Sequence, residues 1–222
     1  MMTDSCCRNS LVFFHRAIAI FCGAIVYSLV FGSVGETASK DKERWDHKYD
    51  TEQYIFGKAP VAFLREHLHL LPKGKTLDIA MGEGRNGVFL ATQGFEVIGI
   101  DISETGLNKA QALAKEHGVT IKTQLVDLER HQFSAEAYDL IICTYYLQRD
   151  LFPKIVKALK PGGMVVVETY TVDYLKYRSR FPRQYLLERN ELFQQFQDLQ
   201  ILRYQLQDDG KTAYASILAQ KP

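Results

Sequence analysis

Five short apolar segments follow one another along the middle of the chain, and mixed segments separate them. The five span residues 76–81, 95–101, 119–126, 139–145 and 163–170. Segments of this length that are apolar throughout predict strands buried on both faces, as in a parallel sheet. Helical spacing fills the gaps between them, as at Leu151, Ile155 and Leu159. The alternation predicts an α/β fold with helices on both faces of the sheet and a ligand site beyond the carboxyl ends of its strands.

The two ends of this region extend the prediction. Apolar residues at helical spacing after Pro60 predict a helix that ends before Pro72. Near the C-terminus, residues 199–206 and 213–219 are strand-like and are joined by a turn sequence that contains Asp-Gly. They predict an antiparallel hairpin, which completes a mostly parallel seven-stranded sheet. We therefore expect residues 61–222 to form one domain.

The N-terminal region has a different pattern. Residues 17–34 carry no charge, and roughly 18 apolar residues are just enough to cross a bilayer as a helix. A signal peptide usually has a shorter apolar region and a small-residue cleavage site, which this segment matches only loosely. We expect residues 1–34 to be a hydrophobic anchor or a signal-like segment, unless the true start lies near Val34. Residues 35–60 then form a linker and a segment that packs on the domain.

Composition excludes some classes of partner. The 27 Lys and Arg residues nearly balance 26 Asp and Glu residues, for a net charge of +1, so no global field would attract nucleic acid. The four cysteines have no spacing typical of a metal site or a disulfide framework, which favours a reducing compartment. His67 and His69 are two residues apart, so on a helix they point to different sides. We expect no metal.

Residues 76–87, with the sequence TLDIAMGEGRNG, predict a strand that ends in a glycine-rich turn and opens a helix. Gly82 to Gly87 match the dinucleotide-binding fingerprint, and Asp101 lies about 20 residues after it at the end of the next strand. A nicotinamide-dependent oxidoreductase is therefore one interpretation. However, Asp78 lies inside the first strand, where an unpaired carboxylate would cost several kcal/mol, so it needs a polar partner near the loop.

The order of Asp78, Gly82 and Gly84 resembles the first motif of class I S-adenosylmethionine-dependent methyltransferases, an acid in strand one followed by a glycine loop. The chain departs from this family at Ala80, where glycine is usual. Alanine is a small change if this position needs no positive φ. The sequence Lys-Pro-Gly-Gly at 160–163 and the C-terminal hairpin are also typical of these methyltransferases and not of dehydrogenases.

Within the family, the chain is most similar to small tellurite-resistance and thiopurine-type methyltransferases. The similarity rests on WDHKYD at residues 45–50 and on LDIAMGEGRNGVFLATQGFEVIGIDIS at residues 77–103, and it covers most of 45–222. The resemblance implies a Rossmann-like class I methyltransferase fold with S-adenosylmethionine as cofactor. In such proteins the segment before the first strand closes over the cofactor. Its aromatic residues here either form a lid or only pack on the sheet: Trp45, Tyr49, Tyr54 and Phe56.

The resemblance also assigns the cofactor site. Gly82 and Gly84 would face the amino-acid part of the cofactor, and Asp101 would bind the ribose hydroxyls. A carboxylate that closes an apolar strand is expected to be exposed with free acceptors. Asp127 would bind the adenine amino group beside Leu128, although it could instead start the following turn. The full predicted set is Asp78, Ala80, Gly82, Gly84, Asp101, Ile102, Asp127, Leu128 and Thr144.

The acceptor site is expected where the fourth strand ends, because this end adjoins the donor methyl group in the family. The Asn/Asp-Pro-Pro-Tyr motif of enzymes that methylate bases or glutamine amides is absent here. Tyrosines at strand ends are often half-buried packing residues, and charge runs are often solvated faces. The predicted substrate residues are Tyr145, Tyr146, Gln148, Tyr170 and Arg178, with Tyr145, Tyr146 or His131 as candidates for accepting a proton.

We therefore expect transfer of a methyl group from S-adenosylmethionine to a small molecule, such as a thiol, a chalcogen oxyanion or another metabolite. The alternatives are an NAD(P)-dependent oxidoreductase and a non-catalytic domain that binds S-adenosylmethionine. Because this cofactor is made and kept inside cells, the catalytic domain is expected in the cytoplasm. It would be tethered through residues 17–34, or soluble if the chain starts near Val34.

Overall fold

The computed structural model describes residues 38–222. Contacts group Glu43–Pro222 into one compact unit, whereas residues 38–42 belong to a second unit. Residues 38–49 are helical. The anchor predicted at residues 17–34 lies outside the described part of the chain. Within that part, none of the helices combines the length and the apolar character needed to cross a membrane.

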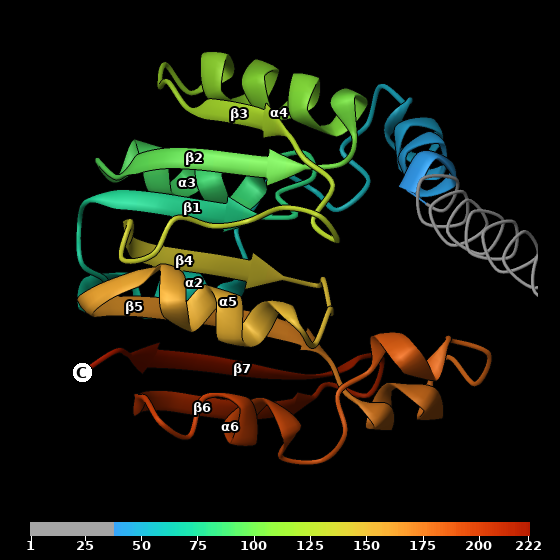
Figure 1. The fold of residues 1–222 in the computed structure, drawn as a ribbon. Coiled ribbons are helices and arrows are strands. Elements are labelled where there is room, and N and C mark those ends of the chain that lie inside the picture. The colour runs from blue at the N-terminus through green and yellow to red at the C-terminus, as the bar shows by residue number, and fades with distance from the viewer. Residues whose placement is uncertain (1–37) are drawn as a thin grey trace, which may run out of the picture. The chain divides into compact units, whose positions relative to one another are not determined.

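A seven-stranded sheet organises the described residues, in the order β3-β2-β1-β4-β5-β7-β6. Strands β1 to β5 run parallel, and β7 pairs antiparallel with both β5 and β6 (Figure 1). The predicted fold class, including the C-terminal hairpin, is confirmed. The strands are β1 Lys75–Ile79, β2 Glu96–Asp101, β3 Lys122–Leu125, β4 Tyr138–Thr144, β5 Leu159–Tyr170, β6 Gln200–Asp208 and β7 Ala213–Gln220.

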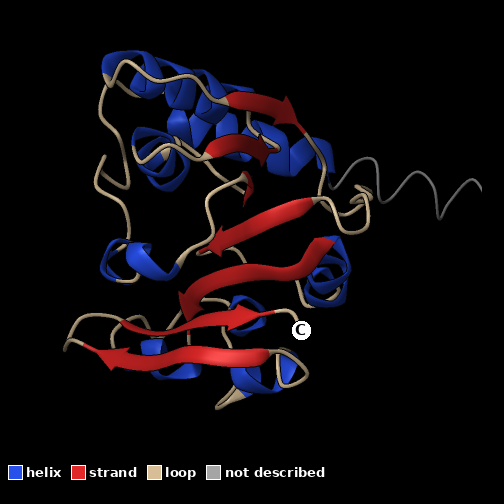
Figure 2. Cartoon of the chain, turned by 90° about the vertical axis from the view of Figure 1, so that its left-hand side faces the viewer, coloured by secondary structure: helices blue, strands red, loops and turns tan. Residues whose placement is uncertain are grey.

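Helices cover both faces of this sheet, as Figure 2 shows. Helices α2, α3 and α4 contribute to one apolar cluster, and α5 and α6 contribute to the cluster on the opposite face. The α-helices are α2 Ala62–Glu66, α3 Arg85–Thr92, α4 Glu104–Glu116, α5 Leu151–Ala158 and α6 Glu191–Gln195. Short 3₁₀ helices lie at η1 Leu68–Leu70, η2 Val172–Lys176 and η3 Arg183–Tyr185.

The predicted helices differ from the observed ones in two places. The helix expected after Pro60 is divided into α2 and η1. Leu159, which was expected in a helix, is the first residue of β5, where it pairs with Tyr138 and is fully buried. Pro161 accounts for this early end, because a proline disfavours the helical conformation of the residue before it.

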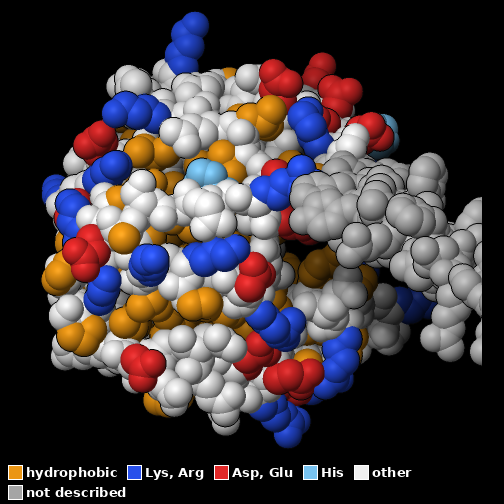
Figure 3. Space-filling model, in the orientation of Figure 1, with side chains coloured by type: hydrophobic (Ala, Val, Ile, Leu, Met, Phe, Trp, Pro, Cys, Tyr) orange, Lys and Arg blue, Asp and Glu red, His pale blue; other side chains and the backbone are white. Residues whose placement is uncertain are grey.

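The carboxyl ends of β1, β2, β4 and β5 meet at one edge of the sheet (Figure 1). Residues 43–56, the N-terminal segment, contact this edge. Residues 171–187, the cap, follow β5 and contain η2 and η3; a bridge between Thr171 and Leu187 closes the cap. On the face seen in Figure 3, Lys and Arg side chains are interspersed with Asp and Glu side chains.

Candidate active site

The glycine loop connects β1 to α3 through residues with positive φ. Gly82 and Gly84 have φ of +55° and +85°, a region that glycine adopts without a side-chain clash. Ala80 also has a positive φ, of +52°. The expectation that Ala80 needs no positive φ is therefore wrong. The loop keeps its path with a strained alanine, at a cost of about 1 kcal/mol.

Asp101 fixes the glycine loop from the end of β2. Its Oδ2 accepts a hydrogen bond from the backbone N–H of Gly82 at 2.7 Å, and its Oδ1 accepts one from Ser103 at 2.9 Å. The residue is only 6% exposed, which differs from the free, exposed carboxylate expected from sequence. Burial raises its pKa, and these backbone hydrogen bonds act in the opposite direction. The carboxylate oxygens keep further lone pairs that these two bonds do not use.

Asp78 lies beneath the same loop on the face covered by α3. It is 1% exposed, and its Oδ2 has no hydrogen-bond partner among the described residues. The backbone N–H of Gly87 acts to lower the pKa of Asp78 but does not outweigh burial, and the polar partner expected from sequence is not found for Oδ2 among the described residues. Burial raises this pKa to about 8, so the carboxyl group is mostly protonated at neutral pH.

Asn86 connects three elements at this edge, and sequence reasoning missed it. Its Nδ2 donates to Thr144 Oγ1 at 2.8 Å, and its Oδ1 accepts the backbone N–H of Val61 at 2.9 Å. The side chain is 3% exposed, so both bonds satisfy polar atoms that would otherwise be buried without partners. The sequence did carry a signal for Asn86. An amide side chain stands there in the first turn of the helix that directly follows the glycine loop.

The N-terminal segment packs directly on the glycine loop. Tyr49 is 5% exposed, and a Cβ atom placed on Gly82 would lie 2.6 Å from its hydroxyl oxygen. Lys109 Nζ holds the segment by donating to the backbone carbonyls of Tyr49, Thr51 and Gln53. The same ammonium group lies 2.5 Å from Oε1 of the buried Glu83. Lys109 and Glu83 were not predicted as site residues.

The other aromatic residues of the segment gather around Tyr49. Trp45 stacks on its ring at 5.5 Å between centroids, and Phe56 meets it edge-on at 6.4 Å. Tyr54 donates its hydroxyl to the carbonyl of Lys109. These aromatics therefore pack the segment on the domain, and closure over a cofactor stays a prediction.

The turn after β3 lies next to Asp101, as the predicted cofactor site requires. The backbone N–H of Val126 donates to the carbonyl of Asp101 at 2.8 Å. Asp127 Oδ1 accepts the N–H of Glu129 at 3.0 Å, so Asp127 does start a turn, which was the alternative interpretation. Leu128 is 5% exposed and belongs to the apolar cluster on the α5 side.

The residues predicted to contact the acceptor are divided into two groups. Tyr145 and Tyr170 are 4.9 Å apart between ring centroids. Tyr146 and Gln148 instead bond to each other, with the tyrosine hydroxyl donating to Oε1 at 2.7 Å. Tyr146 packs against the α5 side of the sheet, whereas Tyr145 packs against the other cluster. The structure therefore brings only Tyr145, Tyr170 and the cap to one place.

A buried carboxyl group fixes Tyr145. The tyrosine hydroxyl donates to Glu168 Oε1 at 2.8 Å, and Ser216 Oγ donates to Oε2 at 2.8 Å. Glu168 is 2% exposed, and burial raises its pKa. Tyr145 has a φ of +56°, an uncommon conformation for a bulky residue. Glu168 and Ser216 were not predicted, because both lie within apolar strands.

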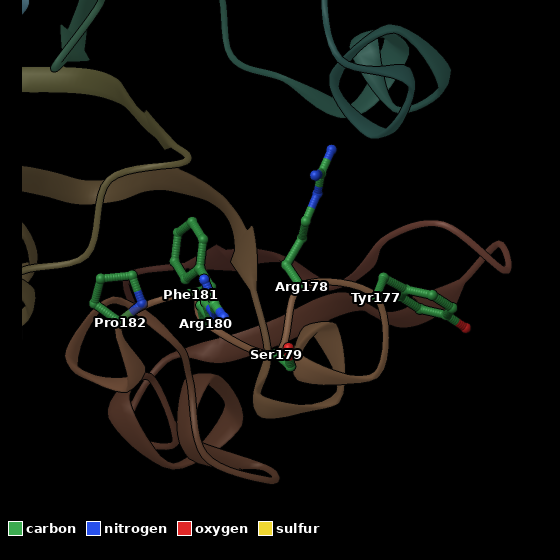
Figure 4. Close-up of a pocket in the computed structure, with 6 residues that line it drawn as sticks. All are labelled: Tyr177, Arg178, Ser179, Arg180, Phe181 and Pro182. Carbon is green, nitrogen blue, oxygen red and sulfur yellow. The ribbon is translucent and has the colours of Figure 1, made fainter.

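Arg178 lies in the cap, where it lines a cavity of about 450 Å³ (Figure 4). The lining residues are Tyr177, Arg178, Ser179, Arg180, Phe181 and Pro182. His131 packs edge-on against Phe133, and burial lowers its pKa. Within residues 38–222, no cluster of His, Cys, Asp or Glu could hold a metal ion.

Residues 76–163, which contain the glycine loop, β2, β3, β4 and all but the first residue of β1, match the family described as "Methyltransferase domain". The match covers less than half of the chain, and this part of the chain is similar to a methyltransferase domain. This similarity confirms the predicted resemblance to class I methyltransferases and S-adenosylmethionine as the cofactor.

Named relatives of this methyltransferase domain include a probable S-adenosyl-L-methionine-dependent methyltransferase, TehB of Haemophilus influenzae. It is 27% identical over 59% of this chain and 47% of its own length. The ubiquinone biosynthesis O-methyltransferase of Rickettsia felis is 30% identical over 53% of this chain and 48% of its own length. Hemagglutinin 1 of Eikenella corrodens is 26% identical over 64% and 49%. The chain spans about half the length of these relatives.

The crystal structure of TehB from Haemophilus influenzae has the same fold as the methyltransferase domain. Its TM-score is 0.63 at 21% identity, over 82% of this chain and 67% of that one. At this identity the similarity establishes the fold alone. The activity of the whole protein and its acceptor are therefore treated as proposals.

Proposed function

We propose that the protein transfers a methyl group from S-adenosylmethionine to a small-molecule acceptor. The observation that carries the proposal is the glycine loop of the methyltransferase domain, held by the hydrogen bond from Gly82 to Asp101 at the carboxyl edge of the sheet. A small-molecule acceptor is supported by the name of one relative, a ubiquinone biosynthesis O-methyltransferase.

The chain has features that fit this cofactor. Gly82 has a positive φ that suits glycine and lets the loop backbone approach a ligand, and the buried Oδ2 of Asp78 beneath it has no hydrogen-bond partner among the described residues. Gly82 and Gly84 would hold the amino-acid part, Asp101 the ribose, Asp127 and Leu128 the adenine, and Thr144 would border the reacting end. When bound, the cofactor supplies an already activated methyl group.

The protein's own task is then alignment and exclusion of water. The N-terminal segment covers the glycine loop through Tyr49, and Lys109 anchors that segment. A thiolate or a reduced chalcogen anion carries no proton to lose and would react without a base. An oxygen or nitrogen acceptor would pass its proton to Tyr145 only if Glu168 accepted the tyrosine proton in turn, because burial raises the pKa of Tyr145 and keeps it neutral.

The same proposal includes the organisation of the chain. Residues 61–222 form the catalytic domain, residues 35–60 its linker and lid, and residues 1–34 a hydrophobic anchor or signal-like segment. Because the cofactor is cytoplasmic, we place the domain in the cytoplasm, tethered to the membrane or soluble. Fractionation of cells that express the full chain tests this: an anchor predicts recovery with membranes after a high-salt wash.

Calorimetric titration of the full chain with S-adenosylhomocysteine and, separately, with NADH tests the cofactor. We expect micromolar binding of S-adenosylhomocysteine only. Asp101→Asn should weaken it at least tenfold, because the substitution removes the charge that the ribose diol and the Gly82 N–H share.

Asp139→Asn is the matched control. Asp139 also accepts a backbone N–H, from Lys75 at 2.9 Å, but lies at the opposite edge of the sheet. This variant should bind S-adenosylhomocysteine as the parent chain does. Binding of NADH alone would reject the proposal in favour of an oxidoreductase, whereas tight S-adenosylhomocysteine binding without turnover of any acceptor would indicate a non-catalytic domain.

A further inference from the structure

Arg85 is a cation without a carboxylate partner at the acceptor side of the site. It is the first residue of α3, and its guanidinium carbon lies 5.4 Å from the centroid of the Tyr145 ring. Its NH1 donates to the carbonyl of Phe56 at 3.0 Å. Within the described residues it forms no ion pair, so its charge faces Tyr145 without a neutralising contact.

Arg178 approaches the same place from the cap. Figure 4 shows its side chain extending away from the loop that carries it, whereas Tyr177 points in another direction. Two other arginines near the cap are paired, Arg183 with Glu188 and Arg149 with Glu191, whereas Arg180 forms no ion pair within the described residues. Arg178 has no such partner among residues 38–222, although it lines the cavity of about 450 Å³.

Aromatic rings that contact one another form a continuous wall from Tyr145 to the cap. Tyr170 lies 4.9 Å from Tyr145 and stacks on Tyr174 at 4.3 Å with an interplanar angle of 8°. Phe181 meets both Tyr170 and Tyr174 edge-on. Tyr145 and Tyr170 are half-buried, so part of each ring is available to a planar ligand.

The charges around this wall favour an anion. Arg85 and Arg178 both act to lower the pKa of Tyr170, so each guanidinium lies within electrostatic reach of its hydroxyl. Two carboxyl groups, Asp78 and Glu168, lie within electrostatic reach of Arg85. Burial raises the pKa of both, to about 8 for Asp78, which is therefore mostly neutral at pH 7. In Glu168, Arg85 and the hydrogen bonds from Tyr145 and Ser216 act against this rise.

We infer that the acceptor is a planar aromatic molecule that carries a carboxylate or a comparable oxyanion. Arg85 and Arg178 bind the anionic group, and the exposed parts of Tyr145 and Tyr170 contact the ring. Guanidinium groups suit this role because they pair with oxyanions in a bidentate geometry. The inference rests on the proposed function and specifies its substrate class.

The test compares benzoate with benzamide, which has nearly the same shape but no charge. Both are titrated against the full chain saturated with S-adenosylhomocysteine, and binding is followed by ligand-observed NMR. Benzoate should bind at least tenfold more tightly than benzamide. Arg178→Met should weaken benzoate binding at least tenfold and leave benzamide binding unchanged. Arg183→Met, which removes a paired arginine from the same cap, is the matched control and should change neither.

Arg85 is tested separately because it follows the glycine loop. Arg85→Lys keeps the charge but loses the planar fork, so benzoate binding should weaken while S-adenosylhomocysteine binding stays within twofold. Loss of S-adenosylhomocysteine binding alone would assign Arg85 to the cofactor and overturn its role here. Tyr170→Leu should weaken benzoate and benzamide equally, because it removes the ring surface.

The outcomes separate this inference from the proposed function. If S-adenosylhomocysteine does not bind the parent chain, the proposed function itself is wrong. If S-adenosylhomocysteine binds but benzoate and benzamide bind equally, or if Arg178→Met has no effect on benzoate, only the anionic aromatic acceptor is rejected.

Discussion

Ala80 holds a backbone conformation that suits glycine, and it does so within the loop that approaches the cofactor. Replacing Ala80 with glycine removes the clash of the Cβ atom at a φ of +52°. We expect Ala80→Gly to raise the free energy of unfolding by about 1 kcal/mol in urea denaturation. Ala91→Gly, inside α3, is the matched control and should lower it by about 0.5–1 kcal/mol. Destabilisation by both substitutions would contradict the strain at Ala80.

Asp78 should make stability depend on pH. Its pKa is about 8 in the folded protein against 3.8 for an unperturbed aspartate. Between these values the unfolded chain loses a proton that the folded chain keeps, so the free energy of unfolding falls as pH rises. Asp78→Asn should remove this fall. It should raise the free energy of unfolding at pH 8 by at most on the order of 5 kcal/mol and change it little at pH 3.

Urea denaturation of both proteins from pH 3 to pH 9 measures this effect. Asp139→Asn is a control of opposite sign, because the bond to Lys160 lowers the pKa of Asp139. That bond stabilises the folded state above the unperturbed pKa and is lost as pH falls. A parallel pH profile for the parent chain and Asp78→Asn would contradict the raised pKa.

At this scale the sequence indicated which residues gather around the glycine loop but not how they are bonded. Asp78, Gly82, Gly84 and Asp101 were found because their order follows strand ends, which a sequence pattern records. Glu168 was missed because one polar residue in an apolar strand does not reveal that Tyr145 and Ser216 meet it from other strands. The burial of Asp101 was also missed, since it depends on the path of the Gly82 backbone.

A buried ion pair, between Lys109 and Glu83, helps to hold the N-terminal segment in position. Lys109 and Glu83 have side chains only 15% and 3% exposed, and Lys109 also binds three carbonyl groups of the segment. Lys109→Met leaves Glu83 buried without its partner, and we expect a loss of about 3–5 kcal/mol in stability. Amide hydrogens of residues 49–54 should also exchange faster, as hydrogen-exchange mass spectrometry would show.

Lys58→Met provides the comparison for this element. Lys58 pairs with Glu116, but both side chains are about half exposed, at 43% and 53%. Exposed pairs of this kind contribute little, so stability should change by less than about 1 kcal/mol. Equal effects of the two substitutions would show that Lys109 does not hold the segment.

Elements with a strong local pattern were predicted well, and those shaped by tertiary contacts were not. Each of the seven strands overlaps the segment that was predicted for it, although β5 begins earlier, at Leu159. The short helices η2 and η3 of the cap were not anticipated, because their stability comes from the packing of Tyr174 and Leu186 rather than from a helical repeat.

The whole unit Glu43–Pro222 should unfold cooperatively, since one sheet runs through it. Trp45, the one tryptophan of the chain, reports on the N-terminal segment, whereas Ile217 is fully buried in β7 near the other edge. Ile217→Ala should cost about 2–5 kcal/mol, and the fluorescence of Trp45 should shift to a lower urea midpoint by the same amount as far-ultraviolet circular dichroism. Leu206→Ala, at a residue 61% exposed, should shift neither signal. Separate midpoints for the two signals would show that the edges unfold independently.

The strand order has a consequence for how such a protein can diverge. The loops after β1, β2 and β3 build the predicted cofactor site, whereas the cap lies beyond β5, on the other side of the point where the chain crosses from β3 to β4. Under the proposed function, mutations confined to residues 171–187 should therefore change the acceptor while the half with the predicted cofactor site stays intact. A gene library randomised only at exposed cap positions is the natural starting point for redirecting the enzyme to a different metabolite.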